Sequence, residues 1–426
     1  MDPEIGSKMT AAKDSLELEA IGSSATKCVV CDSLEWKRFL RFERFPLYIG
    51  TLSREKAMRN RYWSLEAGLC QGCGHGQQMA FPPNEWLSSI YEEDYSCNSP
   101  VLTGIGSELA DCFLSFLVPK LPLRRPLRIL EIGCFDGYTL NRLKQLGHDV
   151  EGCDPSQGAS IARNRLGIPV RREFFRAGLY AKASFDVVIM RHLIEHLTTP
   201  RDFLQAVVEA LRPNGVLALE TPNYVHSIER HQWGDFHIEH VSFFTPASLR
   251  KLLLSAGMTL AGEHLGHFMF MLGSREGSDN LLKGSCDQNN VLEVKQLNHL
   301  VEGFQQKAEK FSSDLRSIVC RLRREGKRLA IYGAGGHTTT MWALQVASSD
   351  QIAYVVDGDA RKWGRWTAGF NLEVHPPERL IREPVDYILL SSDMYEKEMA
   401  HYIREELHLS TPVIRLYPEI KVMEDA

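Results

Sequence analysis

The sequence predicts an α/β protein with two units in which strands and helices alternate, preceded by a small metal-binding domain. Three observations predict this fold class. An apolar strand runs into a glycine turn and a helix at 128–146, and the same theme returns at 328–338. Strands that alternate with helices form a parallel sheet with helices on its faces. Two Cys-x-x-Cys pairs precede the first unit, and cysteines at this spacing are typical of a metal site.

The composition is that of an ordinary globular protein and excludes several other classes. The chain has 426 residues, 44% hydrophobic and 24% charged, which suits two or three domains of roughly 100–200 residues each. No apolar run approaches the ~18–20 residues that span a bilayer, so we expect no membrane partner. The net charge of -5 gives no electrostatic reason to expect a nucleic-acid partner. Without a secretory signal, we expect the protein in the cytoplasm, where thiols stay reduced.

The N-terminal cysteines form two pairs, Cys28 with Cys31 and Cys70 with Cys73. Two such turns supply four thiolates, the tetrahedral set that zinc prefers, although the gap between them is longer than the usual ~15–20 residues. Because sulfur fills all four positions, we expect a closed, structural Zn²⁺ site without catalytic chemistry. The alternative is four scattered core cysteines. The six other cysteines are expected to be buried or to line a site.

The first strand–turn–helix unit has the pattern of a nucleoside-binding site. The strand at 128–132 enters a turn that contains Gly133 and Gly137, and a second strand ends at Asp154. These glycines let the backbone approach a ligand closely. Asp154 stands about 20 residues after Gly133, where an acid at a strand end can hold ribose hydroxyls. The turn reads Glu-x-Gly-x-x-x-Gly rather than the Gly-x-Gly-x-x-Gly of a dinucleotide site.

The rest of this unit resembles the class I S-adenosylmethionine-dependent methyltransferases. A buried strand at 185–190, a helix at 200–211, the turn Leu-Arg-Pro-Asn-Gly and a strand at 216–220 follow in that order. The alternative is a related domain that has lost its ligand. The resemblance implies S-adenosyl-L-methionine as cofactor, and the residues expected to bind it are Glu131, Gly133, Cys134, Phe135, Gly137, Asp154, Pro155, Arg191 and His192.

The triplet His192, Glu195 and His196 has a second interpretation. If the segment is helical, these residues share one face and could hold a metal ion. The resemblance instead places the segment along the edge of the cofactor.

A histidine-rich insertion from 221 to 245 follows the fourth strand of the unit. Loops at the carboxyl ends of parallel strands carry ligand sites, so this insertion is well placed to close over a substrate. A histidine with a pKa near ~6.5 can accept a proton at neutral pH, and a neighbouring glutamate can orient its ring. His240, next to Glu239, is therefore the candidate base. Packing of the loop is the alternative role.

The last third of the chain repeats the glycine-turn theme. Residues 276–325 have the composition of a helical connector, and the strand that follows ends in Tyr332-Gly333-Ala334-Gly335-Gly336-His337. A second strand at 352–357 again ends in an acid. Glycine turns that open helices favour phosphate-bearing ligands.

The order of all these units resembles the zinc-containing sugar C-methyltransferases, a family similar to the tetronitrose C-3 methyltransferase. The resemblance is carried by the zinc cysteines, by Tyr332-Gly333-Ala334, by Val355-Val356-Asp357 and by Lys362-x-Gly364-Arg365. It implies two further sets of residues. The catalytic set is His240, Glu239, His237 and Tyr95. The substrate-binding set is Tyr224, Gly333, Gly335 and His337.

The chain departs from that family at three of these places. His237 and Ile238 stand where the family has tyrosine and histidine, and Gly335-Gly336-His337 replaces a turn with lysine, glycine and asparagine. These departures weaken the inference about the acceptor more than the inference about the donor.

We expect five segments. They are a leader at 1–20 with Met9 as the native start, a zinc-binding domain at 21–85, a class I methyltransferase domain at 86–275, a helical connector at 276–325 and a C-terminal second Rossmann-like domain at 326–426.

The expected function is C-methylation of a nucleotide-linked keto-deoxysugar at C-3, through an enolate formed by the His240 and Glu239 base. The alternatives are O- or N-methylation of another small natural-product intermediate, and a zinc-stapled binding module without activity. The partner is a small molecule, and the sequence does not determine the oligomeric state.

Overall fold

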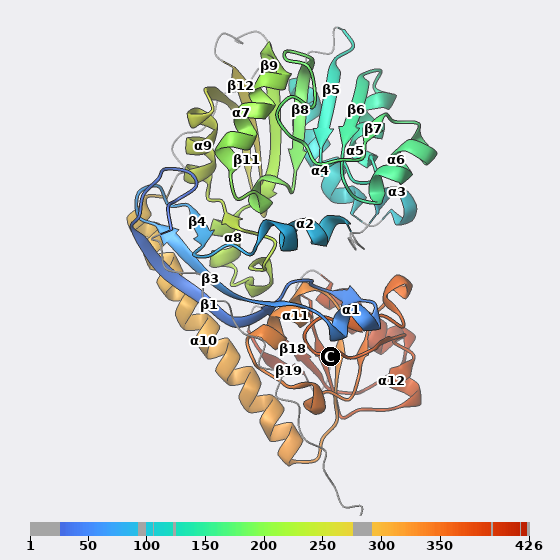
Figure 1. The fold of residues 1–426 in the computed structure, drawn as a ribbon. Helices are drawn as coiled ribbons and strands as arrows, with labels where there is room; N and C mark the ends of the chain where they lie inside the picture. The colour runs from blue at the N-terminus through green and yellow to red at the C-terminus, as the bar shows by residue number, and fades with distance from the viewer. Residues whose placement is uncertain are drawn as a thin grey trace, which may run out of the picture.

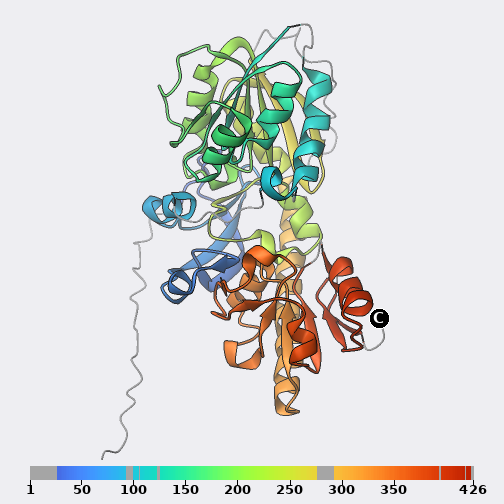
Figure 2. The same cartoon turned by 90° about the vertical axis from the view of Figure 1, so that its right-hand side faces the viewer.

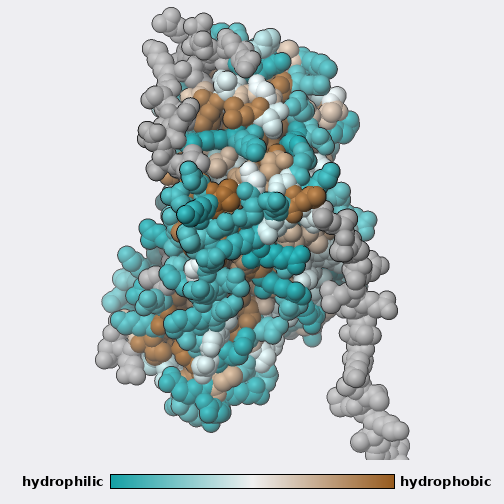
Figure 3. Space-filling model, turned by 90° about the vertical axis from the view of Figure 1, so that its left-hand side faces the viewer, coloured by the Kyte–Doolittle hydropathy of each residue, from teal (hydrophilic) through white to brown (hydrophobic). Residues whose placement is uncertain are grey.

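The computed structural model describes residues 26–92, 99–104, 106–121, 125–275, 292–392, 395–417 and 419–423. Two α/β domains lie one above the other in both ribbon views (Figures 1 and 2). An N-terminal ribbon, formed by the long strands β1 and β3, crosses between them (Figure 1). One long helix, α10, runs along the side of the molecule. The face on the side of α10 is mainly hydrophilic, with hydrophobic residues in small separate patches (Figure 3).

The N-terminal domain is a four-stranded antiparallel sheet in the order β1-β3-β4-β10. Its last strand comes from the histidine-rich insertion, so the N-terminal domain and that insertion share one sheet. A short strand of this domain pairs with β15 of the C-terminal domain. The elements are β1 (Trp36–Pro46), β2 (Thr51–Leu52), α1 (Arg54–Met58), β3 (Tyr62–Cys70), β4 (Gly76–Gln78), β10 (Ser242–Phe243) and β15 (Trp366–Thr367).

The central domain contains a seven-stranded sheet in the order β11-β12-β9-β8-β5-β6-β7. Strands β5 to β9 are parallel, and β12 closes one side antiparallel to β9. Its strands are β5 (Arg128–Ile132), β6 (Asp149–Cys153), β7 (Val170–Arg171), β8 (Phe185–Arg191), β9 (Leu211–Pro222), β11 (Met258–Leu265) and β12 (Phe268–Arg275). Its helices are α2 (Asn84–Glu92), α3 (Pro100–Thr103), α4 (Ser107–Leu117), α5 (Tyr138–Gln145), α6 (Gly158–Leu166), α7 (Pro200–Ala210), α8 (Tyr224–Glu229) and α9 (Pro246–Ser255).

Helix α10 (Val294–Arg324) joins the two α/β domains. Its apolar residues recur on one face, and Leu297, Phe304 and Leu315 are buried against the ribbon and both domains. Packing of this stripe, rather than helix propensity alone, holds so long a helix in place.

The C-terminal domain has a six-stranded sheet in the order β16-β14-β13-β17-β18-β19, parallel except for the last strand. The fold class predicted from the sequence is therefore confirmed. The elements are β13 (Leu329–Tyr332), α11 (Gly336–Ala343), β14 (Val355–Val356), β16 (Val374–His375), α12 (Arg379–Arg382), β17 (Tyr387–Leu390), α13 (Glu396–His401), β18 (Val413–Arg415) and β19 (Lys421–Met423).

Two local expectations and one alternative interpretation were wrong. The strand expected to begin at 216 begins at Leu211, because Leu211 pairs with Phe185 across the sheet. His192 follows strand β8 directly with φ of 48°, so the helical interpretation of the His192, Glu195 and His196 triplet does not hold. Cys112 and Cys320 are exposed rather than buried, since each lies on the solvent side of its helix.

No helix in the described part of the chain is long and apolar enough to cross a membrane.

Candidate functional site

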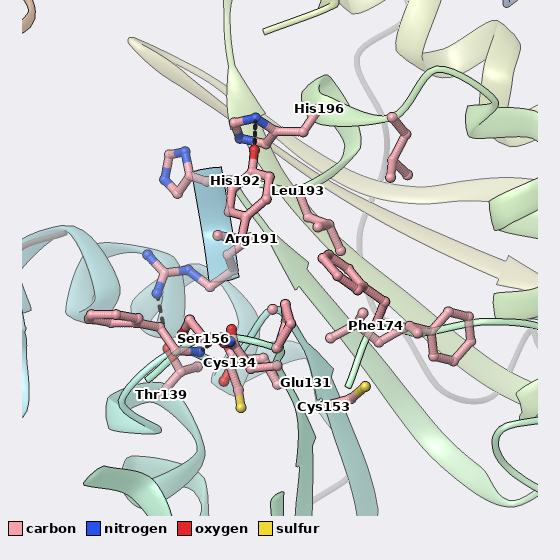
Figure 4. Close-up of a pocket in the computed structure, with 18 of the residues that line it drawn as sticks. Glu131, Cys134, Thr139, Cys153, Ser156, Phe174, Arg191, His192, Leu193 and His196 are labelled. Carbon is pink, nitrogen blue, oxygen red and sulfur yellow. Dashed lines mark hydrogen bonds between the residues drawn. The ribbon is translucent and has the colours of Figure 1, made fainter. Parts of the chain in front are cut away.

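A cavity of about 670 Å³ opens at the carboxyl ends of β5, β6 and β8, and residues of helices α2 and α4 also line it. Figure 4 shows some of its lining residues. Eight of the nine expected cofactor residues line it. The ninth, Gly137, lies behind the turn with φ of 79°, and an added Cβ there would lie 2.7 Å from the Cβ of Ala162. The eight are Glu131, Gly133, Cys134, Phe135, Asp154, Pro155, Arg191 and His192.

The glycine turn is held by the acid at the end of the next strand. The Asp154 carboxylate accepts the Phe135 amide at 2.8 Å through one oxygen and the Ser156 amide at 2.8 Å through the other. Gly133 has φ of 77°, a conformation that favours glycine, and an added Cβ would meet nothing closer than 3.8 Å. The turn therefore leaves open space beside an ordered acid, as a nucleoside site requires.

Glu131 supplies a test of whether the cavity suits S-adenosylmethionine. Its side chain is buried at the end of β5, and Oε2 has no hydrogen-bond partner. Burial raises its pKa to about 8. An unpaired buried carboxylate oxygen costs free energy, and the ammonium of an amino-acid ligand would satisfy it. The residues present thus fit the donor.

Two cations and two further acids form the wall beside Glu131. The Arg191 guanidinium pairs with Glu220 and donates to the Thr139 hydroxyl at 3.0 Å. His192 Nε2 lies 3.2 Å from Glu220 Oε1. Burial lowers the pKa of His192, but Glu220 and Glu195 more than compensate and raise it to about 9. The imidazolium form therefore prevails at neutral pH. Glu220 was not expected from the sequence, and Glu195 was named only as a member of the alternative metal-binding triplet.

A second cluster begins where the cavity ends, at His196. Its Nδ1 lies 2.8 Å from the Tyr91 hydroxyl and 3.0 Å from the carbonyl oxygen of Glu239, and both Tyr91 and His196 line the cavity. The Tyr91–His196 contact is the dashed line beside His196 in Figure 4. The ring of His240 follows, with its centroid 4.9 Å from that of His196. His196 thus stands between the donor cavity and the histidine-rich loop.

The histidine-rich insertion brings together three of the four expected catalytic residues, His237, Glu239 and His240. The rings of His237 and His240 lie 3.8 Å apart, and His237 Nδ1 is 3.4 Å from Glu239 Oε1. Burial lowers the pKa of His237 to about 3 and raises that of Glu239. Burial, and then His237, lower the pKa of His240 well below its usual value. The imidazoles of His237 and His240 are therefore neutral at pH 7.

Tyr95 lies outside the described residues. Tyr91, four residues earlier in the same tyrosine-containing stretch, lines the cavity. The sequence carried a signal for it, because Tyr91 falls in line with Leu87 and Asn84 on one face of α2, and all three line the cavity.

A metal ion is a second possibility for part of this cluster. Ligand atoms of Glu195, His196 and His240 lie within 4.8 Å of one another. The set expected from helical spacing, which paired His192 with Glu195 and His196, is not the one assembled.

The four zinc-ligand candidates meet as expected. Cys28 Sγ is 3.6 Å from Cys73 Sγ, and Cys31 Sγ is 3.5 Å from Cys70 Sγ. A tetrahedron with Zn–S bonds of ~2.3 Å has edges of ~3.8 Å, whereas a disulfide needs ~2.05 Å. Hydrogen bonding to Cys28 and Cys70, together with burial, raises the pKa of Cys73. The geometry and the donor set fit a four-thiolate metal site.

The expected substrate residues lie away from the cavity. Tyr224 is buried, and its hydroxyl is 2.6 Å from His240 Nδ1. Gly333 has φ of 111°, and Gly335 caps α11 with nothing within 4 Å of an added Cβ. His337 Nδ1 lies 2.6 Å from the Tyr417 hydroxyl. An added Cβ at Gly234, in the histidine-rich loop, would lie 3.0 Å from the His337 ring.

In the second glycine turn, as in the first, a backbone amide of the turn donates to the acid at the end of the next strand. The Ala334 amide donates to Asp357 Oδ2 at 2.8 Å, as the Phe135 amide does to Asp154. In the second turn Lys362 also pairs with Asp357, at 2.8 Å. The two turns therefore present different charges to a ligand.

Comparison with known proteins identifies both α/β domains. Residues 106–261 match a family model described as a methyltransferase domain, and residues 273–411 match a model described as a C-methyltransferase C-terminal domain. Together the models cover more than half of the chain.

Two relatives illustrate the similarity. The C-methyltransferase NovU of Streptomyces niveus is 22% identical over 93% of this chain and 96% of its own length. A ubiquinone biosynthesis O-methyltransferase of Roseobacter denitrificans is 31% identical, over 31% of this chain and 60% of its own length.

Solved structures are similar to part of the chain. A possible histamine N-methyltransferase from Thermotoga maritima is 21% identical, with 39% of this chain and 89% of that chain covered and a TM-score of 0.34. Magnesium protoporphyrin IX methyltransferase from Synechocystis PCC 6803 is 16% identical, with 46% and 100% covered and a TM-score of 0.36.

Proposed function

Because this chain is a methyltransferase that carries both a methyltransferase domain and a C-methyltransferase C-terminal domain, we propose that it methylates a carbon of a nucleotide-linked keto-deoxysugar, at C-3. The observation that carries the proposal is the cluster of His196, His237 and His240 at the end of the donor cavity. A carbon acceptor next to a ketone needs a base, and the neutral imidazoles of His237 and His240 lie in this cluster.

S-adenosylmethionine supplies the methyl group when it is bound. Glu131 accepts a hydrogen bond from its ammonium, and Asp154 holds its ribose hydroxyls. Arg191 and His192 order Glu220 and the wall of the cavity. The side chains of Cys134, Phe135 and Pro155 enclose the remaining space.

His240 is the base in this proposal. Its Nε2 takes the proton from the carbon beside the ketone, and the electron pair passes into the enolate. The enolate carbon then forms the new bond to the methyl group as the bond from methyl to sulfur breaks. Tyr91 lines the cavity, and its hydroxyl can donate a hydrogen bond to the developing oxyanion, while His196 Nδ1 donates to the Glu239 carbonyl oxygen. Glu239 and His237 support the base from the loop.

The zinc-ligand cysteines Cys28, Cys31, Cys70 and Cys73 hold a structural Zn²⁺ in this proposal, and the glycine turn of the C-terminal domain receives the nucleotide. The N-terminus of α11, where Gly335 provides no capping side chain, offers backbone amides for a phosphate. The domain boundaries expected from the sequence belong to the same proposal.

Solvent deuterium exchange tests the reaction class. Each of dTDP-, CDP- and GDP-linked 4-keto-6-deoxyglucose is incubated in D₂O with the enzyme and S-adenosylhomocysteine. Exchange at C-3 without transfer is expected, because the base acts before the methyl group moves. His240→Asn abolishes exchange, whereas His231→Asn, a matched change in the same insertion outside the cluster, retains it. Exchange that persists in His240→Asn contradicts the base assignment.

O- or N-methylation is the second candidate. The Tyr91–His196 pair favours it, because a base beside the cavity can equally deprotonate a hydroxyl. An O-methyltransferase is also among the relatives, similar over 31% of this chain. This candidate predicts turnover without any exchange of a carbon-bound hydrogen.

A further inference from the structure

Strand β4 follows the second zinc turn directly and carries two consecutive buried glutamines, Gln77 and Gln78. Successive side chains on a strand point to opposite faces. The two amides therefore reach different parts of the molecule, although neither lines the cavity.

Gln77 holds the first zinc turn. Its Oε1 accepts the amide of Val29, which lies between Cys28 and Cys31, at 3.0 Å. Its Nε2 donates to the carbonyl oxygen of Lys27 at 3.2 Å. The side chain thus ties the first cysteine pair to the strand that leaves the second.

Gln78 holds the histidine-rich loop. Its Nε2 donates to the carbonyl oxygens of Ile238 at 2.8 Å and His240 at 2.9 Å, and lies 3.4 Å from that of His237. Its backbone amide donates to the Val241 carbonyl at 3.0 Å. One residue therefore gathers the backbone on both sides of Glu239.

The strand pairing continues this support. Ser242 pairs with Gln77, and Phe243 with Gly76. An added Cβ at Gly76 would lie 2.9 Å from the Phe243 carbonyl oxygen, so only glycine allows this close approach. The Gln78 side chain therefore holds the loop at the Ile238 and His240 carbonyls, and the pairing of β10 with β4 holds its C-terminal end.

We propose that Gln78 is a positioning residue for methyl transfer, and that β4, through Gln77 and Gln78, makes the zinc turns part of the support of the His237–His240 loop. This inference rests on the proposed function of that loop. The carbonyls of Ile238 and His240 are held by one amide in a buried place where water cannot easily replace it. A shift of the base by about 1 Å can cost ~100-fold in rate.

The test compares Gln78→Met with Gln77→Met in the full-length zinc protein. Both changes keep the length of the side chain and remove its amide. Three quantities are measured: hydrogen exchange of the peptide 236–244, the affinity for S-adenosylhomocysteine, and kcat and KM.

Gln78→Met should exchange the loop amides faster and lower kcat about 10- to 100-fold, with S-adenosylhomocysteine affinity within about threefold of the parent because the cavity wall is unchanged. Gln77→Met should instead speed exchange at 27–32 and zinc release to a chelator, with less effect on the loop.

Gln78→Glu serves if the methionine variant does not fold. A protonated carboxyl can donate to a carbonyl, whereas an ionised one cannot. This variant should therefore lose turnover and loop protection together as pH rises, which a purely structural lesion would not do.

Unchanged loop exchange in Gln78→Met, or turnover within about twofold of the parent, overturns the inference. Loop exchange and S-adenosylhomocysteine binding need no acceptor. If the sugar panel fails while the loop still loosens, the proposed function fails and the role of Gln78 stands.

Discussion

The Tyr224 hydroxyl lies 2.6 Å from Nδ1 of His240 and 3.3 Å from the carbonyl oxygen of Asp235. A carbonyl oxygen only accepts, so the Tyr224 hydroxyl donates its hydrogen bond to Asp235. The hydroxyl oxygen in turn accepts a hydrogen bond from the Nδ1–H of His240. This arrangement selects one tautomer and leaves the lone pair of His240 on Nε2. A ring fixed in this way can accept a proton from a substrate.

Tyr224→Phe should lower kcat about three- to tenfold, since a hydrogen bond contributes ~0.5–1.5 kcal/mol and tenfold corresponds to ~1.4 kcal/mol. The loss is limited because His240 Nδ1 keeps the Asp235 carbonyl at 3.2 Å. Steady-state kinetics measure it. Binding of S-adenosylhomocysteine should not change, and an unaltered kcat would show that the tautomer is set without Tyr224.

The acid limb of kcat/KM should lie well below pH 6.5. Burial, followed by His237, depresses the pKa of His240, so the basic form persists as the pH falls through the usual histidine range. A pH–rate profile measures the limb. A limb at or above pH 6.5 would point to a base whose pKa is not depressed.

Binding of S-adenosylhomocysteine should release a proton near neutral pH. Burial raises the pKa of Glu131 to about 8, so this carboxyl is largely neutral in the free protein at pH 7. A ligand ammonium favours the ionised form, and affinity should therefore rise with pH and level off above about 8.

Calorimetry in buffers of different ionisation enthalpy measures this release. Glu131→Gln should remove the buffer dependence and weaken binding. The same dependence in that variant would assign the proton to another group.

The purified protein should hold one zinc ion per chain, bound by Cys28, Cys31, Cys70 and Cys73. Cys73→Ser or a strong chelator should lower the melting temperature, because metal binding stabilises the folded state. Elemental analysis and thermal unfolding provide the measurements. The exposed Cys320 offers a matched control, and Cys320→Ser should leave both unchanged. A stoichiometry of zero would remove the metal from the proposal.

Gly234→Ala should disturb the histidine-rich loop from the side of the C-terminal domain. The new methyl group would lie 3.0 Å from the His337 ring, so either the ring or the loop must move. We expect kcat to fall several-fold, and His337→Ala in the same chain to restore much of it by making room. A double-mutant cycle measures the coupling. Additive effects would show that the contact does not transmit strain.

Local patterns in the sequence were enough to predict the strands, the glycine turns, the cysteine pairs and the acid at Asp154. Each depends on residues close together in the chain: apolar runs define strands, and positive φ at Gly133 needs glycine. The cavity assembled by these turns contains eight of the nine residues expected around the donor. The sequence also predicted that Glu239 and His240 lie on a loop at the carboxyl end of the sheet.

The side chains that contact this loop could be identified only from the tertiary structure. Tyr91 meets His196 and Gln78 meets the carbonyls of Ile238 and His240, contacts between residues more than a hundred positions apart. Periodicity reports which face of a strand or helix is buried, but it carries no information about the element packed against that face. Local sequence patterns were thus enough for a methyltransferase fold with two cysteine pairs of metal-site spacing. The packing of β4, α2 and the loop determined which tyrosine, which histidine and which glutamine serve it, because these contacts exist only once distant elements share one core.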